Sequence, residues 1–426
     1  MQHASLPSRR ILLVDALRGF ALLLILLVHN EEHFFYPVYW KYGPAWLDIV
    51  DKVVYSVTAN VFAGKAEAIF ALLFGFTFYM QSSNMAYRGG DFGVRFLWRM
   101  LLLVGFAMLN AAFLPGGDML LLCSALSIVL YITRNWSDKA VLCASVFFLL
   151  QPVEWVRCVL CLIDSQCQSS YSYMDYMDML YNELQYIAQV GGWGRFFLNN
   201  ITLGPQASFL SALLSGCISQ TAGLFLLGSY MGRRQMFLVV DEDRYALRDM
   251  IKMNDNKKKW VLLLIASAIA IGPVCALKEP VMLAAKDVPG MAEILGVVLD
   301  MWHNLAFTFV LMSSFVLLYC TAWSSKCAVI LTVSGRLSLT CYVMQSVLGA
   351  LIYFPIFFNF AYYFGATCSL LVFLNNFFIQ FIFCDIWIMK HNRGPLETIW
   401  HKLTWIGSKN DIINNRHIWK SQEESL

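Results

Sequence analysis

The chain has 426 residues, of which 59% are hydrophobic and only 14% carry a formal charge. Soluble domains usually have about 25% charged residues, so this composition excludes an ordinary soluble protein and indicates a polytopic membrane protein. The net charge of +3 gives no reason to expect a nucleic-acid partner, and the lipid bilayer is the expected surrounding.

Ten apolar runs are long enough, or nearly so, to cross the hydrocarbon core, which takes about 20 helical residues. They cover 11–30, 57–80, 96–114, 118–133, 140–163, 208–231, 260–277, 301–323, 335–355 and 366–389. The fourth run is short, and a re-entrant segment is the alternative for it. The sequence therefore predicts an all-α fold of about ten transmembrane helices.

Lysine and arginine gather in alternate connections between these runs. Most of the 31 basic residues fall before the first run, in the loop 232–259, after the last run and in two shorter connections. Because cytoplasmic loops accumulate Lys and Arg, both termini are predicted to be cytoplasmic. The predicted organisation is a helical bundle over 1–389, with an outer loop 164–206 and an inner loop 232–259, followed by a cytoplasmic amphipathic tail over 390–426.

The first run carries ionisable side chains inside an apolar helix. At about 100° per residue, Asp15, Arg18, His29 and His33 fall on one face. Such groups usually face a bundle interior or a wet cavity. In one interpretation Asp15 and Arg18 pair structurally and the histidines lie at the water interface. In the other, this face is a site that handles protons or acyl groups, since imidazole exchanges protons near neutral pH.

Further charges lie at the ends of the next three runs. Lys65 either extends its amine to the interface or faces a cavity shared with the histidines. Arg95 and Arg99 are one turn apart, and they either anchor the third run at the inner face or bind an anionic group there. Asp118 follows a Pro-Gly-Gly turn, where a carboxylate stabilises a helix start or orients an imidazole.

Two acid and base pairs at a spacing of three residues are most simply internal pairs: Glu154 with Arg157, and Asp300 with His303. In the outer loop, tyrosines and methionines alternate with acids over 171–187. This pattern predicts a helix that lies on the outer leaflet or covers a cavity mouth.

The ninth run begins with a polar stripe at helical spacing, which can supply hydrogen bonds between helices. Its members are Ser338, Tyr342, Gln345, Ser346 and Gly349, and Arg336 precedes them as a candidate for anion binding. The twelve cysteines lie mostly inside apolar runs, where free cysteine acts as a small hydrophobic residue. No disulfide framework and no metal site are predicted.

The tail begins with Gly394 and Pro395, and Glu397 follows two residues later. Proline in the first turn and an acid near the positive end of a helix are signals of a helix start. These three residues and Asp15 are assigned structural roles. The tail is expected to form an amphipathic helix on the inner leaflet.

Five segments together resemble the YeiB-like family of bacterial inner-membrane proteins, domain-of-unknown-function (DUF) family 418. They are LVDALRGFALLLILL, AGKAEAIFALLFGF, RMLLLVGFAMLNAAFLPGGDML, SGRLSLTCYVMQS and RGPLETIW, and they span nearly the whole chain. The chain departs from the family where a histidine is common, at Asn110, and where an asparagine is common, at Cys341. The resemblance implies a multi-pass protein of the bacterial inner membrane.

The first run is also similar to that of transmembrane acyltransferases, including the heparan-alpha-glucosaminide N-acetyltransferase type. This remote likeness implies acyl transfer from cytoplasmic acyl-CoA to an acceptor at the outer face, with no permanently bound cofactor. In that hypothesis His29 or His33 is the general base or acyl carrier and Asp118 orients it. The substrate would be bound by Arg18, Lys65, Arg95, Arg99, Arg336, Tyr342 and Gln345. The alternative is a proton- or ion-coupled transporter of small solutes, in which the same charges line a path at mid-membrane.

Overall fold

The computed structural model describes residues 11–33, 44–87, 92–114, 116, 119–163, 168–238, 247–321, 324–362 and 365–406, and every regular element in these ranges is a helix. The first half contains α1 (Leu12–Val28), α2 (Ala45–Val57), α3 (Lys65–Tyr87), α4 (Gly93–Ala111), α5 (Met119–Thr133), α6 (Asp138–Leu149), α7 (Pro152–Ile163) and α8 (Gln168–Val190). The second half contains α9 (Trp193–Leu214), α10 (Cys217–Arg233), α11 (Leu247–Ala285), α12 (Met291–Tyr319), α13 (Ser324–Arg336), α14 (Ser338–Tyr353), α15 (Ala366–Lys390) and α16 (Pro395–Thr404).

Six of the described helical segments are long and apolar enough to cross a membrane, or up to nine if each of three bent helix pairs is one span. The six are Leu12–Glu31, Ala45–Tyr87, Gly93–Ala111, Met253–Ala285, Met291–Tyr319 and Ala366–Lys390. The pairs α6–α7, α9–α10 and α13–α14 bend by 46°, 80° and 90°. The short fourth run is the 15-residue helix α5. The molecule is therefore an all-helical, membrane-embedded bundle.

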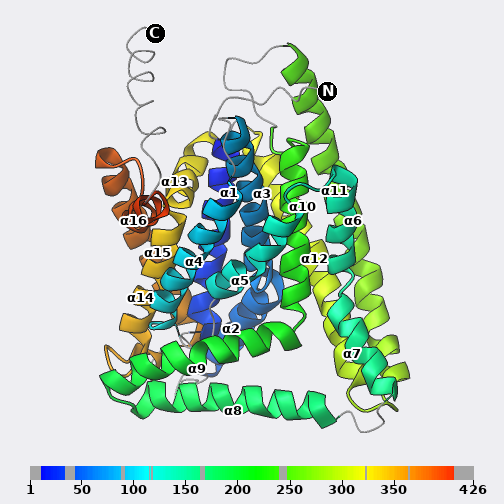
Figure 1. The fold of residues 1–426 in the computed structure, drawn as a ribbon. Helices are drawn as coiled ribbons and strands as arrows, with labels where there is room; N and C mark the ends of the chain where they lie inside the picture. Colours follow the sequence, from blue (N-terminus) through cyan, green and yellow to red (C-terminus); the bar gives the residue numbers. More distant parts are fainter. Residues whose placement is uncertain are drawn as a thin grey trace.

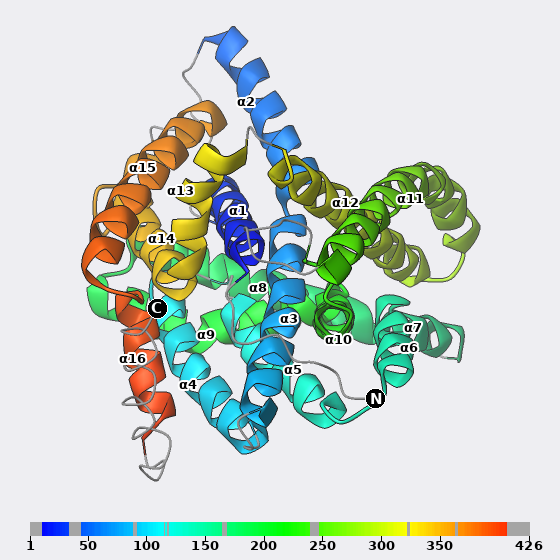
Figure 2. The ribbon, with the colours of Figure 1, turned by 90° about the horizontal axis from the view of Figure 1, so that it is seen from above.

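Helix α1 lies at the centre of this bundle. Figure 2 shows it between α3, α12, α13 and α14, and 13 of its 17 residues are buried. The sequence predicts that one polar side of this helix faces inward, and Asp15 and His29 on that side are buried. Asn30 and Glu31, which lie off that side, are also buried. The helix is enclosed by protein on nearly every side, because neighbouring helices replace lipid around it.

Glycine allows α1 and α13 to approach closely. A Cβ atom on Gly19 would lie 1.9 Å from the carbonyl oxygen of Leu331, and one on Gly335 would lie 1.9 Å from that of Asp15. Small residues at such crossings let helix backbones meet within a membrane. This crossing holds Asp15 and Arg18 at a fixed position in the bundle.

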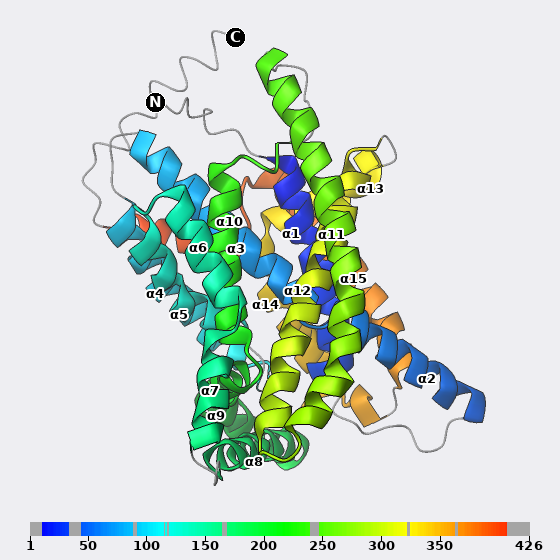
Figure 3. The same ribbon diagram turned by 90° about the vertical axis from the view of Figure 1, so that its right-hand side faces the viewer.

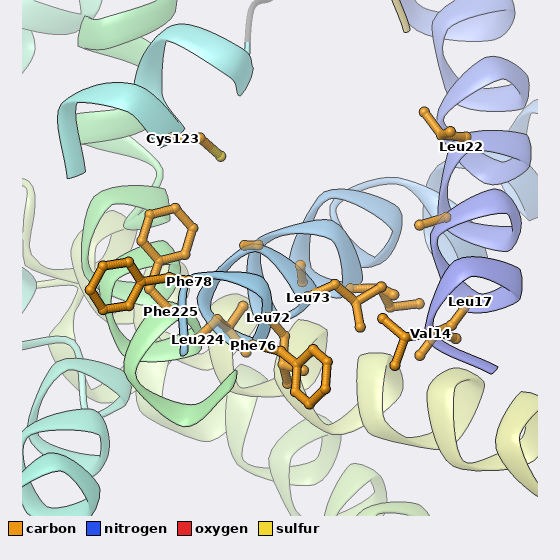
Figure 4. Packing of buried hydrophobic residues seen from close by; sticks show 14 of the residues in the cluster. Val14, Leu17, Leu22, Leu72, Leu73, Phe76, Phe78, Cys123, Leu224 and Phe225 are labelled. Atoms are coloured by element: carbon orange, nitrogen blue, oxygen red, sulfur yellow. The ribbon is translucent and has the colours of Figure 1, made fainter. Parts of the chain in front are cut away.

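A glycine also allows α3 and α10 to approach closely. A Cβ atom on Gly228 would lie 1.8 Å from the carbonyl oxygen of Leu72. Around this contact Phe76 and Phe225 belong to one buried hydrophobic cluster, and Figure 4 shows side chains of α3 lying between those of α1 and those of α10. Helices α1, α3 and α10 are thus the rigid frame on which the remaining helices pack.

Helix α2 leaves the side of the bundle, as Figure 3 shows. The predicted second span begins at residue 57, whereas the helical segment runs over Ala45–Tyr87 through a π-helical turn at Thr58–Phe62. The middle of α2 is held by Asp51, whose carboxylate accepts hydrogen bonds from the amide (2.7 Å) and hydroxyl (2.5 Å) of Thr367. A polar contact from a distant helix therefore sets where this element lies.

Helices α8 and α9 lie across one end of the bundle, whereas α16 lies toward the opposite end (Figure 1). The helix predicted over 171–187 is present as α8. The hydroxyl of Tyr181 donates to the carbonyl of Gly116 at 2.7 Å, and burial raises the pKa of this phenol. Asn200 on α9 donates to the carbonyl of Ala112 at 3.1 Å. These bonds fasten the end layer to the turn between α4 and α5.

The two predicted pairs at three-residue spacing do not form as expected within the described residues. Arg157 donates to the carbonyl of Leu214 at 3.4 Å and makes no ion pair with Glu154. Asp300 instead pairs with Lys278 on α11, at 2.6 Å. Spacing along one helix did not reveal these partners, because each lies on another helix.

Helix α16 starts at Gly394 and Pro395, but Glu397 does not serve only its own helix. Its carboxylate accepts hydrogen bonds from the amides of Leu339 (2.7 Å) and Thr340 (3.0 Å), and from the Thr340 hydroxyl at 2.5 Å. These amides belong to the first turn of α14, whose N–H groups have no partner within the helix. Glu397 thereby caps α14 and docks α16 on the bundle.

We expect Glu397→Gln to lower the free energy of unfolding by about 2 kcal/mol, since charge-assisted hydrogen bonds contribute about 1.5–3 kcal/mol. Thermal unfolding of the purified protein measures the change. Glu293→Gln is the matched control, because Glu293 lies exposed in the first turn of α12. Equal melting temperatures for the two variants would contradict the capping role.

Candidate functional site

A cavity of about 200 Å³ opens among α1, α3, α4, α5, α14 and α16. Its wall is mainly apolar and aromatic, formed by Phe70, Leu73, Phe74, Phe78, Phe96, Met100, Leu103, Leu120, Leu339 and Trp400. Its polar groups come from Arg18, Thr77, Gln81, Arg99, Ser338 and Tyr342. Ligand sites typically combine such an apolar wall with a few polar groups.

Arg18 brings a positive charge from α1 into this cavity. Its guanidinium donates to the carboxylate of Asp15 at 3.0 Å and to the hydroxyl of Thr77. The side chain of Asp15 is 3% exposed, whereas that of Arg18 is 20% exposed. Asp15 therefore positions Arg18, and the guanidinium faces the hollow.

Arg99 brings a second positive charge from α4. Its guanidinium lies 4.2 Å from the ring centre of Trp400, and the indole nitrogen of Trp400 donates to the Arg99 carbonyl at 3.0 Å. The Nε atom of Arg99 is buried without a hydrogen-bond partner, and within the described residues Arg99 has no carboxylate partner. A half-buried cation of this kind is costly unless an anion compensates it.

Tyr342 links the cavity to the buried histidine. Its ring lies edge-on to that of His29, with centroids 5.8 Å apart, and Phe70 stacks beside it at 6.5 Å. His29 is 3% exposed and does not itself line the cavity. The polar side of α1 thus continues from the cavity, past Tyr342, to an imidazole.

The structure divides the predicted site residues into two groups. Arg18, Arg99 and Tyr342 line the cavity. Arg95 instead donates to the carbonyls of Thr404 (3.0 Å) and Ile406 (3.4 Å), and so holds the end of α16. The predicted grouping of all four arginines around one ligand is therefore not seen.

Gln345, Lys65 and Arg336 also lie away from the cavity lining. Gln345 donates to the Leu22 carbonyl (3.2 Å) and to Gln380 (3.0 Å), and so joins α1, α14 and α15. Lys65 is buried at the start of α3, 5.9 Å from the ring centre of Phe307. Arg336 ends α13, beside the close crossing with α1. Asp118 and the side chain of His33 lie outside the described residues.

The sequence analysis did not identify the polar residues Thr77 and Gln81 or the aromatic residues of the cavity, which include Trp400. Thr77 and Gln81 are four residues apart on α3, so they lie on one side of this helix. This spacing could have identified the two residues from the sequence. Trp400 could not be identified in this way, because its position depends on how α16 packs against α4.

Comparisons with known proteins agree with the resemblance read from the sequence. Residues 246–407 match the model of a family described as "Protein of unknown function (DUF418)". The chain is also 22% identical over 427 residues to the uncharacterized protein YxaH of Bacillus subtilis (strain 168), a match that covers 94% of this chain and 96% of that protein. The match to the family covers α11 to α16, which include the cavity residues Ser338, Tyr342 and Trp400.

Proposed function

We propose that the protein binds an anionic acyl donor of the acyl-CoA class in this cavity and transfers the acyl group to an acceptor. The observation that carries the proposal is that Arg18 and Arg99 both line one mainly apolar cavity. Arg99 has no carboxylate partner among the described residues. Two guanidinium groups suit a phosphate or carboxylate. The aromatic and aliphatic wall suits a hydrocarbon chain.

The size of the cavity limits which part of an acyl donor it can hold. Drug-sized ligands occupy pockets of about 300–1,000 Å³, so about 200 Å³ suits an acyl group and its nearest polar atoms, with the rest of the donor outside. The basic residues of α16 and of the start of α11 support a cytoplasmic location for the end of the bundle at which these elements lie. The donor would then enter from the cytoplasm.

In the proposed reaction His29 is the general base. The acceptor atom attacks the thioester carbonyl carbon, the C–S bond breaks, and the acceptor's proton passes through the imidazole to the leaving thiolate. Tyr342 lies between His29 and the cavity and would orient the imidazole or the thioester. His33 and Asp118 stay in the proposal as a second imidazole and an orienting carboxylate.

Acyl-CoA turnover by purified protein in lipid nanodiscs tests the proposal, with free CoA measured by mass spectrometry. We expect turnover in the wild type and a loss of about 100-fold or more in His29→Ala, the scale of general acid–base catalysis. His391→Ala is the control, because His391 is exposed at the end of α15. A wild-type protein that releases no CoA from any acyl-CoA would refute acyl transfer.

Coupled transport is the second candidate function, favoured by the three bent helix pairs. Discontinuous membrane helices form the substrate and ion sites of many transporters. Uptake of a solute into proteoliposomes, without acyl-CoA turnover, would favour this function over the enzyme.

A further inference from the structure

Two of the bent helix pairs meet at their breaks. The α6–α7 break contains Gln151, a buried residue with φ of +64°, and the α9–α10 break contains Gly216, with φ of +75°. The hydrogen-bond network assigns the Gln151 amide with its nitrogen donating to the carbonyl of Gly216 at 3.1 Å and to the carboxylate of Glu154 at 3.0 Å. One side chain therefore joins both breaks to an acidic residue.

Within the part of the chain that the structure describes, no cationic side chain is in hydrogen-bond contact with the carboxylate of Glu154. The residue is 0% exposed, and its Oε1 atom has no hydrogen-bond donor within the described residues. Arg157, one turn away, donates instead to the carbonyl of Leu214. A buried carboxylate in this position must either take up a proton or hold a cation.

Neutral polar groups of α10 and α12 lie near the break at Gly216. Ser219, in the first turn of α10, is 1% exposed, and its hydroxyl faces the carboxylate of Glu154. The next residue, Gln220, accepts from Asn304 at 3.0 Å and donates to the carbonyl of Met301 at 2.8 Å. The Oδ1 atom of Asn304 is buried without a donor among the described residues.

Charged and titratable groups on α3, α7 and α10 lie around the two breaks. Glu67, on α3, and Glu154 both act electrostatically on the Cys217 thiol. Lys65 acts on Glu67 and on His303, and Arg157 lies on the same helix as Glu154 and acts on it from a distance. Each of the two acids is thus acted on by one cation, but within the described residues no cation forms an ion pair with Glu154, so its carboxylate remains able to coordinate a bound cation.

We propose that the point where these two helix breaks meet is a binding site for a monovalent alkali cation, with Glu154 as its charged ligand and Ser219 as a neutral one. Broken helices expose backbone carbonyls, and alkali cations in membrane proteins are coordinated by such oxygens. Within the described part of the chain, no group of three or more His, Cys, Asp or Glu side chains is arranged to hold a metal ion. The oxygen-rich surroundings therefore suit Na⁺ better than a transition metal.

Binding of radioactive ²²Na⁺ to the full-length protein in nanodiscs, with choline as the competing inert cation, tests the site. We expect saturable binding in the wild type and at least about tenfold weaker binding in Glu154→Gln, which removes the only charged ligand. Ser219→Ala should weaken binding by a smaller factor. Glu293→Gln, an exposed acid on α12, should bind as the wild type does.

Three outcomes would overturn the site. They are an absence of saturable ²²Na⁺ binding in the wild type, equal binding in Glu154→Gln and the wild type, and titration of Glu154 by protons with no ²²Na⁺ bound. If Glu154→Gln fails to fold, the ²²Na⁺ affinity of Ser219→Ala is measured in its place. An affinity equal to that of the wild type would also overturn the assignment. None of these results depends on acyl-CoA, so the cation site is tested independently of the proposed reaction.

Discussion

The double variant Arg18→Gln/Arg99→Gln should bind acyl-CoA about 100-fold more weakly than the wild type, and Arg99→Gln alone about tenfold more weakly. Each guanidinium that contacts an anion contributes about 1.5–3 kcal/mol, and 1.4 kcal/mol corresponds to a factor of ten. Equilibrium binding of radiolabelled acyl-CoA to the protein in nanodiscs measures both changes.

Arg95→Gln is the matched control for this experiment. Arg95 is on the same helix, one turn from Arg99, but its guanidinium is bound to carbonyls at the end of α16. This variant should lower the melting temperature and leave the affinity within about threefold of the wild type. If Arg95→Gln and Arg99→Gln reduce affinity equally, the arginines act only through general positive charge, and the cavity is not the site.

Gly335→Ala should destabilise the protein by about 3 kcal/mol or prevent its folding. The new Cβ atom would lie 1.9 Å from the carbonyl oxygen of Asp15 and 2.8 Å from the amide nitrogen of Gly19. Both contacts are with backbone, so no side chain can move aside, and α13 must separate from α1. Overpacking of this kind typically costs about 1–3 kcal/mol, occasionally more.

Thermal unfolding and size-exclusion chromatography measure this loss. Gly272→Ala is the control, because a Cβ atom there meets nothing within 4 Å, and alanine favours a helix over glycine. The control should be at least as stable as the wild type. A Gly335→Ala protein with the same melting temperature as the control would contradict the close crossing of α1 and α13.

The sequence predicted the features that depend on composition and local pattern. The apolar runs indicated an all-helical membrane bundle, and the polar spacing on the first run indicated that Asp15 and Arg18 lie inside it. The one-turn spacing of Arg95 and Arg99 identified two cationic candidates, of which Arg99 lines the cavity with Arg18. Proline and glycine at 394–395 marked the start of α16.

The features that the sequence did not predict depend on contacts between distant segments. Glu397 caps a helix whose first turn is more than 50 residues away, and Arg95 binds carbonyls more than 300 residues away. Neither partner can be read from periodicity. The break at Gln151 had a local signal in Pro152, which begins α7, but the positive φ of Gln151 depends on the surrounding packing.

Photochemical labelling with a diazirine-bearing acyl-CoA tests directly whether the cavity between α1, α3, α4 and α14 holds an acyl donor. Saturable labelling of peptides containing Phe74 on α3 or Leu103 on α4 is expected, suppressed by excess unlabelled acyl-CoA and reduced in Arg99→Gln. Labelling confined to helices that do not line the cavity, such as α11 or α15, or labelling that excess ligand does not suppress, would contradict binding of the donor in this cavity.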